Sequence, residues 1–205
     1  MTDRGGGDAR HWDTVFATRS ADEVSWFEAN HAHSVSLLRE QPGSVIDVGA
    51  GAGTLVDELL ADGRTDVTLL DISHEALALT RERLGTGEQR VGYVVSDLLA
   101  WEPSRTFDAW HDRAVFHFLT DPADQASYVD LAASAVSPGG LMVLAAFGPD
   151  GPTACSGLPT ARHSAAGLGA LFAPAFTVTG AQTRVHRTPG GADQQFTWVV
   201  MRLGA

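Results

Sequence analysis

Lysine is absent from this 205-residue sequence, and all 14 basic residues are arginines. This absence excludes a Schiff-base lysine and the phosphate-binding lysine of a Walker-type loop. Cysteine occurs once, at Cys155, which excludes an internal disulfide framework and makes a reducing cytoplasm the simplest compartment. The first ten residues lack the apolar stretch of a secretory signal, and no apolar run approaches the roughly 20 residues of a membrane-spanning helix.

Positive charge is also scarce. The 14 basic residues stand against 25 acidic ones, for a net charge of -11. Residues 1–102 hold 18 of the acids and 8 of the bases, so the excess is concentrated in the first half. Nucleic-acid binding needs a basic surface, so we expect no nucleic-acid partner. Eight histidines are present, but only His31 and His33 form a close pair, so no metal site is expected.

The length suits a single core of ordinary size. We expect a disordered tail over residues 1–10, a helical N-terminal segment with a bend over residues 11–40, and one domain over residues 41–205. Apolar runs predict strands, which cover residues 44–48, 67–71, 91–95, 107–111 and 141–147. Helical patterns lie between and after them, over residues 55–61, 74–84, 121–136 and 164–172. This alternation predicts a parallel sheet with helices on both faces.

The end of the chain has a different pattern. Two long strands are expected over residues 176–187 and 195–203, joined by a turn that contains Pro189-Gly190-Gly191. The sequence therefore predicts an antiparallel hairpin that closes the parallel sheet.

A glycine-rich turn follows the first predicted strand, in the segment Val45–Leu55 with the sequence VIDVGAGAGTL. Glycines in such a turn let the backbone approach a ligand closely. The spacing is G-x-G-x-G, whereas dinucleotide-binding proteins have G-x-G-x-x-G. Asp47 lies inside the preceding strand and would repel a pyrophosphate. Asp47 suits a cationic ligand instead, for example one that carries an α-amino group and a sulfonium.

Acidic residues end the next two predicted strands. Asp71 lies 18 residues after Gly53, close to the spacing expected of a carboxylate that binds ribose hydroxyls. Asp97 follows the third strand, where a carboxylate can accept a hydrogen bond from an adenine amine. Ser73 directly precedes a helical run and is the expected N-cap.

With these motifs, residues 40–205 resemble the class I S-adenosylmethionine-dependent methyltransferases. The resemblance implies an α/β, Rossmann-like sheet of seven mostly parallel strands in the order 3-2-1-4-5-7-6, with strand seven antiparallel and an N-terminal helical lid. It also implies that S-adenosylmethionine is the cofactor and S-adenosylhomocysteine the product.

The resemblance places cofactor contacts on the three acidic strand ends. Gly49, Ala50, Gly51 and Gly53 would line the methionine portion, and Asp47 would orient its amino group. The ribose and adenine contacts would come from a second set of residues, namely Asp71, Ile72, Asp97 and Leu98.

The segment Trp110–Leu119 resembles thiopurine and related thiol methyltransferases and a broad group of bacterial methyltransferases. The resemblance makes His111, Asp112 and Arg113 the candidates near the transferred methyl group, with His111 also a cofactor contact. Asp112 and Arg113 equally suit a local salt bridge that holds the loop. His117 is expected to pack among neighbouring aromatic rings.

Trp12 and Trp26 resemble the start of thiopurine-type enzymes, where an N-terminal segment folds over the cofactor. The alternative is that these rings only dock a helix on the core. The loop after the fifth strand, residues 148–163, would contact the acceptor by resemblance, and Cys155 within it is expected to be a small buried apolar residue.

We therefore expect methyl transfer from S-adenosylmethionine to a small-molecule thiol, hydroxyl or amine. A protein side chain or terminus is the alternative acceptor, and a non-catalytic module that binds the cofactor is a second alternative. A nucleotide-dependent oxidoreductase is disfavoured by the glycine spacing. No membrane partner is expected, and a general base is needed only if the acceptor must lose a proton first.

Overall fold

The computed structural model describes residues 6–20 and 22–204. These residues form a mixed seven-stranded sheet with helices on both faces and a separate two-stranded sheet. Seven strands follow the order β3-β2-β1-β4-β5-β9-β8. Strands β1 to β5 pair in parallel, and β9 is antiparallel to both β5 and β8. This is the topology predicted from the sequence, with β9 as the antiparallel strand, and the fold prediction is confirmed.

The parallel strands and their helices begin and end close to the predicted positions. The parallel strands are β1 (Val45–Val48), β2 (Val67–Asp71), β3 (Val91–Val95), β4 (Phe107–Arg113) and β5 (Val136–Phe147). The helices that follow β1, β2, β4 and β5 are α3 (Leu55–Ala61), α4 (His74–Leu84), α5 (Pro122–Ala135) and α6 (Ala165–Phe172). Strand β5 starts five residues earlier than the predicted 141, because Val136 pairs with Phe107 before an irregularity in the β4–β5 register.

Short elements complete the fold. The terminal hairpin consists of β8 (Phe176–Arg187) and β9 (Asp193–Leu203). A small hairpin, β6 (Ala154–Cys155) with β7 (Leu158–Pro159), forms within the loop after β5 and was not predicted. Three short 3-10 helices are also present, namely η1 (Gly85–Arg90), η2 (Leu98–Ala100) and η3 (Phe116–Phe118).

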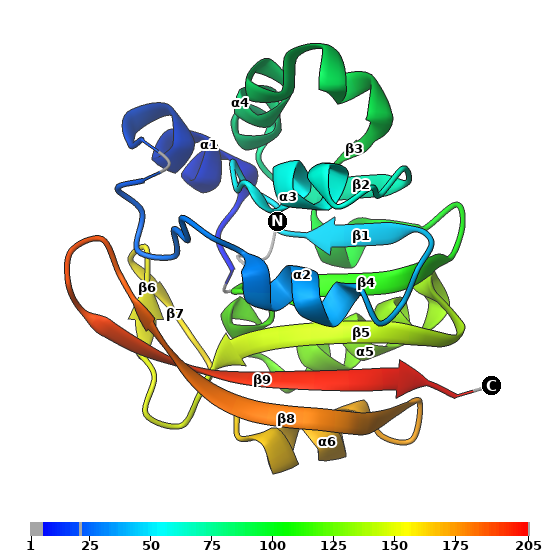
Figure 1. Ribbon diagram of the computed structural model, residues 1–205. Helices are drawn as coiled ribbons and strands as arrows, with labels where there is room; N and C mark the ends of the chain where they lie inside the picture. Colours follow the sequence, from blue (N-terminus) through cyan, green and yellow to red (C-terminus); the bar gives the residue numbers. More distant parts are fainter. Residues whose placement is uncertain (1–5, 21, 205) are drawn as a thin grey trace.

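The N-terminal segment holds two helices, α1 (Ala9–Thr18) and α2 (Ala32–Leu38), separated by an irregular stretch. Helix α1 starts at Ala9 because Asp8 caps it, accepting from the backbone N–H of His11 at 2.9 Å. The tail expected to be disordered covers residues 1–10, of which residues 1–5 lie outside the described residues. Helix α1 begins within that expected tail, at Ala9. Helix α1 and the β6–β7 hairpin lie at the edge where the parallel strands end (Figure 1).

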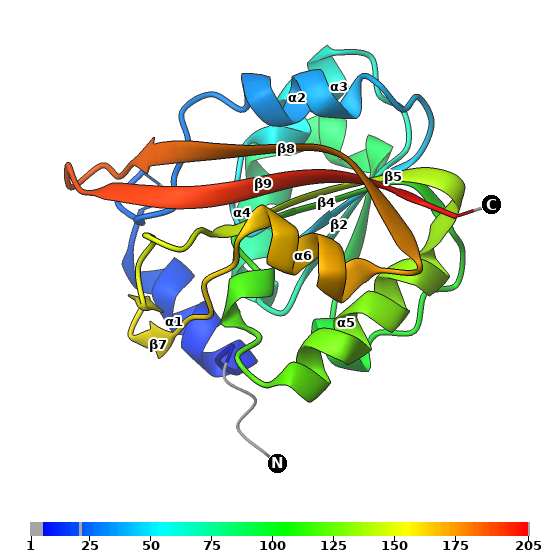
Figure 2. The same cartoon turned by 90° about the horizontal axis from the view of Figure 1, so that it is seen from below.

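The sheet separates two hydrophobic layers. Helices α2 and α3 cover one face, and α5 and α6 cover the other (Figure 2). Strand β1 contributes to both layers, because Val45 packs with the first and Ile46 with the second. Strictly alternating side chains in strands buried on both faces explain the continuous apolar runs of the sequence. No helix in the described ranges 6–20 and 22–204 is long and apolar enough to cross a membrane.

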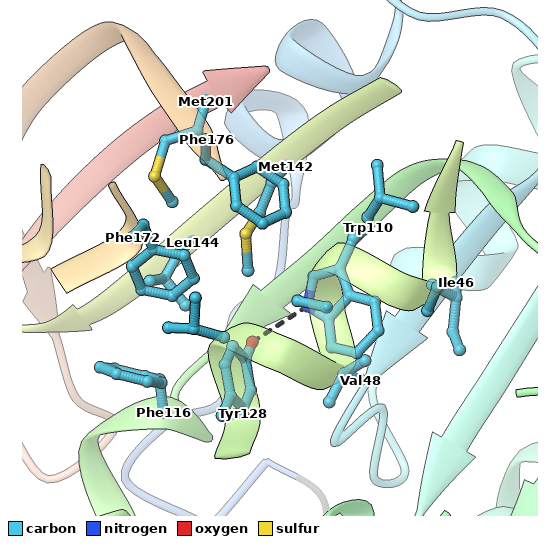
Figure 3. Packing of buried hydrophobic residues seen from close by; sticks show 14 of the residues in the cluster. Ile46, Val48, Trp110, Phe116, Tyr128, Met142, Leu144, Phe172, Phe176 and Met201 are labelled. Carbon is cyan, nitrogen blue, oxygen red and sulfur yellow. Dashed lines mark hydrogen bonds between the residues drawn. The ribbon is translucent and has the colours of Figure 1, made fainter. Parts of the chain in front are cut away.

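The α5 layer contains a buried polar contact (Figure 3). The indole Nε1 of Trp110 donates to the hydroxyl of Tyr128 at 2.9 Å, and that hydroxyl donates to Asp112 Oδ2 at 2.6 Å. All three side chains are fully buried. The hydroxyl therefore satisfies two groups that have no access to water, which fixes strand β4 on helix α5.

We expect Tyr128→Phe to lower the free energy of unfolding by about 2–4 kcal/mol, because it leaves a buried indole N–H and a buried carboxyl without this partner. Urea denaturation measures the change. Tyr93→Phe is the matched control, because the Tyr93 hydroxyl has no hydrogen-bond partner among the described residues. Equal, small effects of the two substitutions would contradict the assigned contact.

Candidate functional site

The turn after β1 is shaped by glycine. Gly49 and Gly51 both have positive φ angles, +64° and +56°, which side-chain-bearing residues rarely adopt. The Gly49 backbone N–H donates to the Leu70 carbonyl at 2.7 Å, so the turn bends over the end of β2. A Cβ atom on Gly49 would lie 1.9 Å from Val115 Cγ2, so no larger residue fits there. The turn requires glycine at position 49 because the backbone has a positive φ there and passes close to the Val115 side chain.

Asp71 lies at the end of β2 and stabilises the glycine turn through hydrogen bonds to the backbone. Its carboxylate accepts from the backbone N–H groups of Gly51 and Ser73, each at 2.8 Å. Burial raises the pKa of Asp71 to about 6; the two backbone hydrogen bonds oppose that rise, and the negative charges of Asp47 and Asp13 add to it. A carboxylate held in this way has lone pairs left for further donors.

Ser73 connects the end of β2 to the N-terminal segment. As predicted, it caps α4 by accepting from the Ala76 backbone N–H at 3.1 Å. Its hydroxyl donates to Asp13 Oδ1 of helix α1 at 2.7 Å. The predicted N-cap therefore also docks α1 beside the glycine turn.

A cavity opens where the parallel strands end. Its wall includes residues from all three acidic strand ends and from the N-terminal segment. The predicted site residues among its lining are Trp12, Trp26, Gly49, Gly51, Asp71, Ile72, Asp97, Leu98 and Arg113. Asp97 caps the following turn by accepting from the Leu99 backbone N–H at 3.0 Å.

A smaller, more polar hollow lies beside this cavity. The two share Phe16, Trp26, Gly49 and Arg113 in their walls. The remaining predicted residues line the hollow, namely Asp47, Ala50, Gly53 and His111. Every predicted site residue except Asp112 therefore lines one of these two adjoining spaces.

His111 and Asp47 form a buried hydrogen-bonded chain. His111 Nδ1 lies 2.7 Å from Asp47 Oδ1, and its Nε2 lies 3.0 Å from the hydroxyl of Ser34 on α2. All three side chains are buried. Both ring nitrogens of His111 are thus engaged within the protein, and the ring fixes the Asp47 carboxylate at the edge of the hollow.

Asp112 points to the opposite side of the sheet, as alternation along a strand requires. Besides the Tyr128 hydroxyl, it accepts from the backbone N–H of Val115 at 3.0 Å. Burial raises the pKa of Asp112 to about 6, although the bond from Tyr128 opposes the rise. The structure thus shows Asp112 holding the loop that follows β4.

Arg113 ties strand β4 to the N-terminal segment. Its Nη1 donates to the Trp26 carbonyl at 2.9 Å, and its Nη2 lies 3.0 Å from Glu28 Oε1. The ion pair is largely buried, with 8% and 23% of the two side chains exposed. Burial lowers the pKa of Arg113, while the charge of Glu28 opposes that change. The salt bridge considered from the sequence is therefore made with Glu28, and Asp112 takes no part in it.

The N-terminal aromatic residues cover the cavity. Trp12 lies edge to face with Trp26 at 5.7 Å and with Phe118 at 5.3 Å between ring centroids. Phe16 lies below them, 6.3 Å from the Trp26 ring. The rings thus both dock helix α1 and form part of the cavity wall.

Several residues that line the cavity were not predicted as site residues. They come from the loop after β4 and from the strands at the other edge of the site, namely Val115, Phe118, Phe147, Cys155, Gln194 and Phe196. Cys155 is buried, and burial raises the pKa of its thiol. Only the position of Cys155 in the loop after β5 gave a sequence signal, because the other contacts depend on how the terminal hairpin closes the sheet.

The chain is similar to known methyltransferases in its central part. Residues 45–140 match the family described as "Methyltransferase domain". Over 72 residues it is 43% identical to the release factor glutamine methyltransferase of Koribacter versatilis, covering 34% of this chain and 26% of the relative. Over 97 residues it is 34% identical to the malonyl-[acyl-carrier protein] O-methyltransferase of Neorickettsia risticii, covering 40% and 39%. The chain thus spans well under half the length of either relative.

The likeness of fold extends over nearly the whole chain. The structure of Burkholderia thailandensis 1,6-didemethyltoxoflavin-N1-methyltransferase, with bound 1,6-didemethyltoxoflavin and S-adenosylhomocysteine, matches with a TM-score of 0.69. The match covers 96% of this chain and 84% of that one, at 21% identity. The comparisons bear out the resemblance found in the sequence: residues 45–140 match a methyltransferase domain, and the fold of nearly the whole chain is similar to that of a methyltransferase with bound S-adenosylhomocysteine.

Proposed function

We propose that this protein transfers the methyl group of S-adenosylmethionine to a small-molecule acceptor that carries a thiol, hydroxyl or amine. One observation carries the proposal. The glycine turn and Asp71 share a cavity with the aromatic rings of Trp12, Trp26 and Phe196, under the N-terminal segment. This arrangement offers cofactor contacts on one side and an apolar, covered acceptor space on the other.

The residues present fit the cofactor. Gly49 and Gly51 line the cavity without side chains, and Asp71 on the same wall keeps lone pairs for ribose hydroxyls. Asp47 and the backbone around Ala50 and Gly53 would receive the methionine portion in the polar hollow. Asp97, with Ile72 and Leu98, would flank the adenine in the cavity. When bound, the cofactor supplies a methyl group already activated on a sulfonium.

The chain's own residues contribute positioning and exclusion of water. Trp12 and Trp26 form an aromatic cover, and aromatic faces favour a cation over water. Arg113 holds that cover in place through the Trp26 carbonyl. When the reactants are held in contact and water is excluded, positioning alone supplies much of the rate acceleration, without acid or base catalysis.

The three candidates on β4 take different parts in this proposal. Arg113 is the one that lines the main cavity, and it would favour the anionic form of an acceptor such as a thiol. His111 would act as a positioning residue for Asp47, and Asp112 as a positioning residue for the β4 loop. A base from the protein is then needed only for acceptors that do not ionise on their own.

A protein acceptor is the second candidate, because the release factor relative bears that activity in its name. The covered cavity favours a small molecule, since a side chain of a folded protein needs an open approach.

The single cysteine supports a reducing compartment such as the cytoplasm, and the bacterial relatives support a bacterial setting.

We expect labelled methyl groups from S-adenosylmethionine to appear on small thiols, phenols or amines in a screen that also includes cell lysate. Label on low-molecular-weight products supports the proposal. Label only on lysate proteins would support the protein acceptor, and tight binding of the cofactor with no transfer to any class would support a non-catalytic module.

We expect the affinity for S-adenosylhomocysteine to rise with pH up to about 6 and then level off, because Asp71 has a pKa of about 6 and its charged form accepts ribose hydroxyls better. Calorimetric titration between about pH 5 and pH 8 measures this dependence. Asp71→Asn should bind about ten- to a hundredfold more weakly and without this pH dependence. The exposed Asp130→Asn is the control, and a flat wild-type profile would contradict the assignment.

We expect Trp26→Ala to weaken cofactor binding and slow methyl transfer several-fold, because water enters the space that Trp26 covers on both sides. Trp26→Phe should restore most of the loss, since it keeps an aromatic face, while both variants retain the backbone carbonyl that Arg113 binds. Full activity of the alanine variant would exclude a covering role for Trp26.

A further inference from the structure

A short strap, residues 25–28, borders both spaces of the candidate site. It belongs to the irregular stretch between α1 and α2, and Trp26 within it lines the main cavity and the polar hollow. In the proposed function the cofactor occupies both spaces at once, so the bound cofactor lies against the Trp26 ring. Side chains that hold the strap in place therefore also resist dissociation of the cofactor.

Arg113 of β4 binds this strap at two points. Its Nη1 donates to the Trp26 carbonyl at 2.9 Å, and its Nη2 lies 3.0 Å from Glu28 Oε1. Neither Nε nor Nη2 makes a hydrogen bond among the described residues, so the attraction between Arg113 and Glu28 is mainly ionic. A buried cation is stable only beside an anion that compensates its charge. Glu28 therefore keeps the guanidinium where it can bind the Trp26 carbonyl.

Glu28 is surrounded by basic side chains. Besides Arg113, Nδ1 of His31 lies 3.4 Å from Glu28 Oε2, and Nδ1 of His186 lies 3.9 Å from Glu28 Oε1. Burial raises the pKa of Glu28, but the hydrogen bond to His31 and the charge of Arg113 lower it overall, so the carboxyl is ionised near pH 7. The strap thus carries the anion that Arg113 requires.

His186 holds the strap at a third point, from the terminal hairpin. Its Nε2 donates to the Ser25 carbonyl at 2.8 Å, and its ring lies edge to face with Phe196 at 6.2 Å between ring centroids. Strand β8, which carries His186, is the edge strand farthest from β2 and β3 in the sheet. The strap is therefore held from a part of the sheet that supplies none of the acidic strand ends.

We propose that Glu28 and His186 are positioning residues for the cofactor. Both act through Trp26: Glu28 fixes the guanidinium that binds the Trp26 carbonyl, and His186 fixes the preceding carbonyl. Together they keep the strap closed over the cofactor and set the rate at which it leaves. This inference rests on the proposed function, because it takes S-adenosylhomocysteine as a ligand of both spaces.

The test measures the dissociation rate of S-adenosylhomocysteine from the full chain by surface plasmon resonance. We expect Glu28→Gln and His186→Phe each to raise this rate several-fold, up to the effect of Trp26→Ala. Glu28→Gln keeps the shape of the side chain and removes its charge. His186→Phe keeps a ring against Phe196 and removes the donor to Ser25. Circular dichroism checks that each variant folds, and either variant alone decides the inference.

A double-mutant cycle separates positioning from a general loss of stability. Once the Trp26 ring is removed, a residue that acts through it has nothing left to position. In a Trp26→Ala background we therefore expect Glu28→Gln or His186→Phe to change the dissociation rate by less than about twofold.

Asp66→Asn is the control for the loss of an ion pair. Asp66 pairs with Arg105 at 2.6 Å, and neither residue lines the main cavity or the polar hollow. This variant should release S-adenosylhomocysteine at the wild-type rate.

Wild-type dissociation rates in both single variants would overturn the inference. So would effects that multiply fully with that of Trp26→Ala, because these indicate a contact with the cofactor that does not pass through Trp26. In either case the bound S-adenosylhomocysteine leaves the proposed function intact. Failure of wild-type protein to bind S-adenosylhomocysteine would instead overturn the proposed function, and the positioning roles with it.

Discussion

The carboxylate of Asp71 is the contact on which the rest of the site depends. Its two oxygens hold the backbone of Gly51 in one loop and of Ser73 in the next, so the ends of β1 and β2 keep one fixed arrangement. Ser73 then anchors helix α1 through Asp13. A buried carboxylate is costly, and these two N–H groups compensate part of that cost. The same carboxylate thus shapes the glycine turn, places the N-terminal segment and faces the cavity.

Because side chains alternate between the two faces of the sheet along β4, three consecutive polar residues of this strand make contacts on different faces. His111 and Arg113 face the α2 side of the sheet, where they contact Ser34 and Glu28, while Asp112 faces α5 and the Tyr128 hydroxyl. The sequence reads as one polar cluster, but a strand sends neighbouring side chains to opposite faces. One residue can therefore line the cavity while the next holds the loop that shapes it.

The cover of the site is assembled from distant parts of the chain. Arg113 holds the Trp26 carbonyl, and His186 of β8 lies 2.8 Å from the Ser25 carbonyl. Burial opposes the charge on Glu28, but hydrogen bonding to His31 and the charge of Arg113 lower the pKa of that carboxyl overall. The irregular stretch between α1 and α2 is thus held by side chains of β4 and β8, which explains an ordered path without regular secondary structure.

The sequence by itself determined most strand and helix limits, the glycine turn and the acidic strand ends, because these depend on local periodicity and on fixed spacing within one βαβ unit. The sheet order followed only from the resemblance of these motifs to the methyltransferase family. It also placed Ser73 as a cap and His117 among aromatic rings. Only the tertiary structure decided which face each β4 residue occupies in the site, the pairing of Arg113 with Glu28, and the approach of Gln194 and Phe196 to the cavity. Those contacts join residues far apart in the chain, and local pattern carries no information about distances that the closed sheet alone sets.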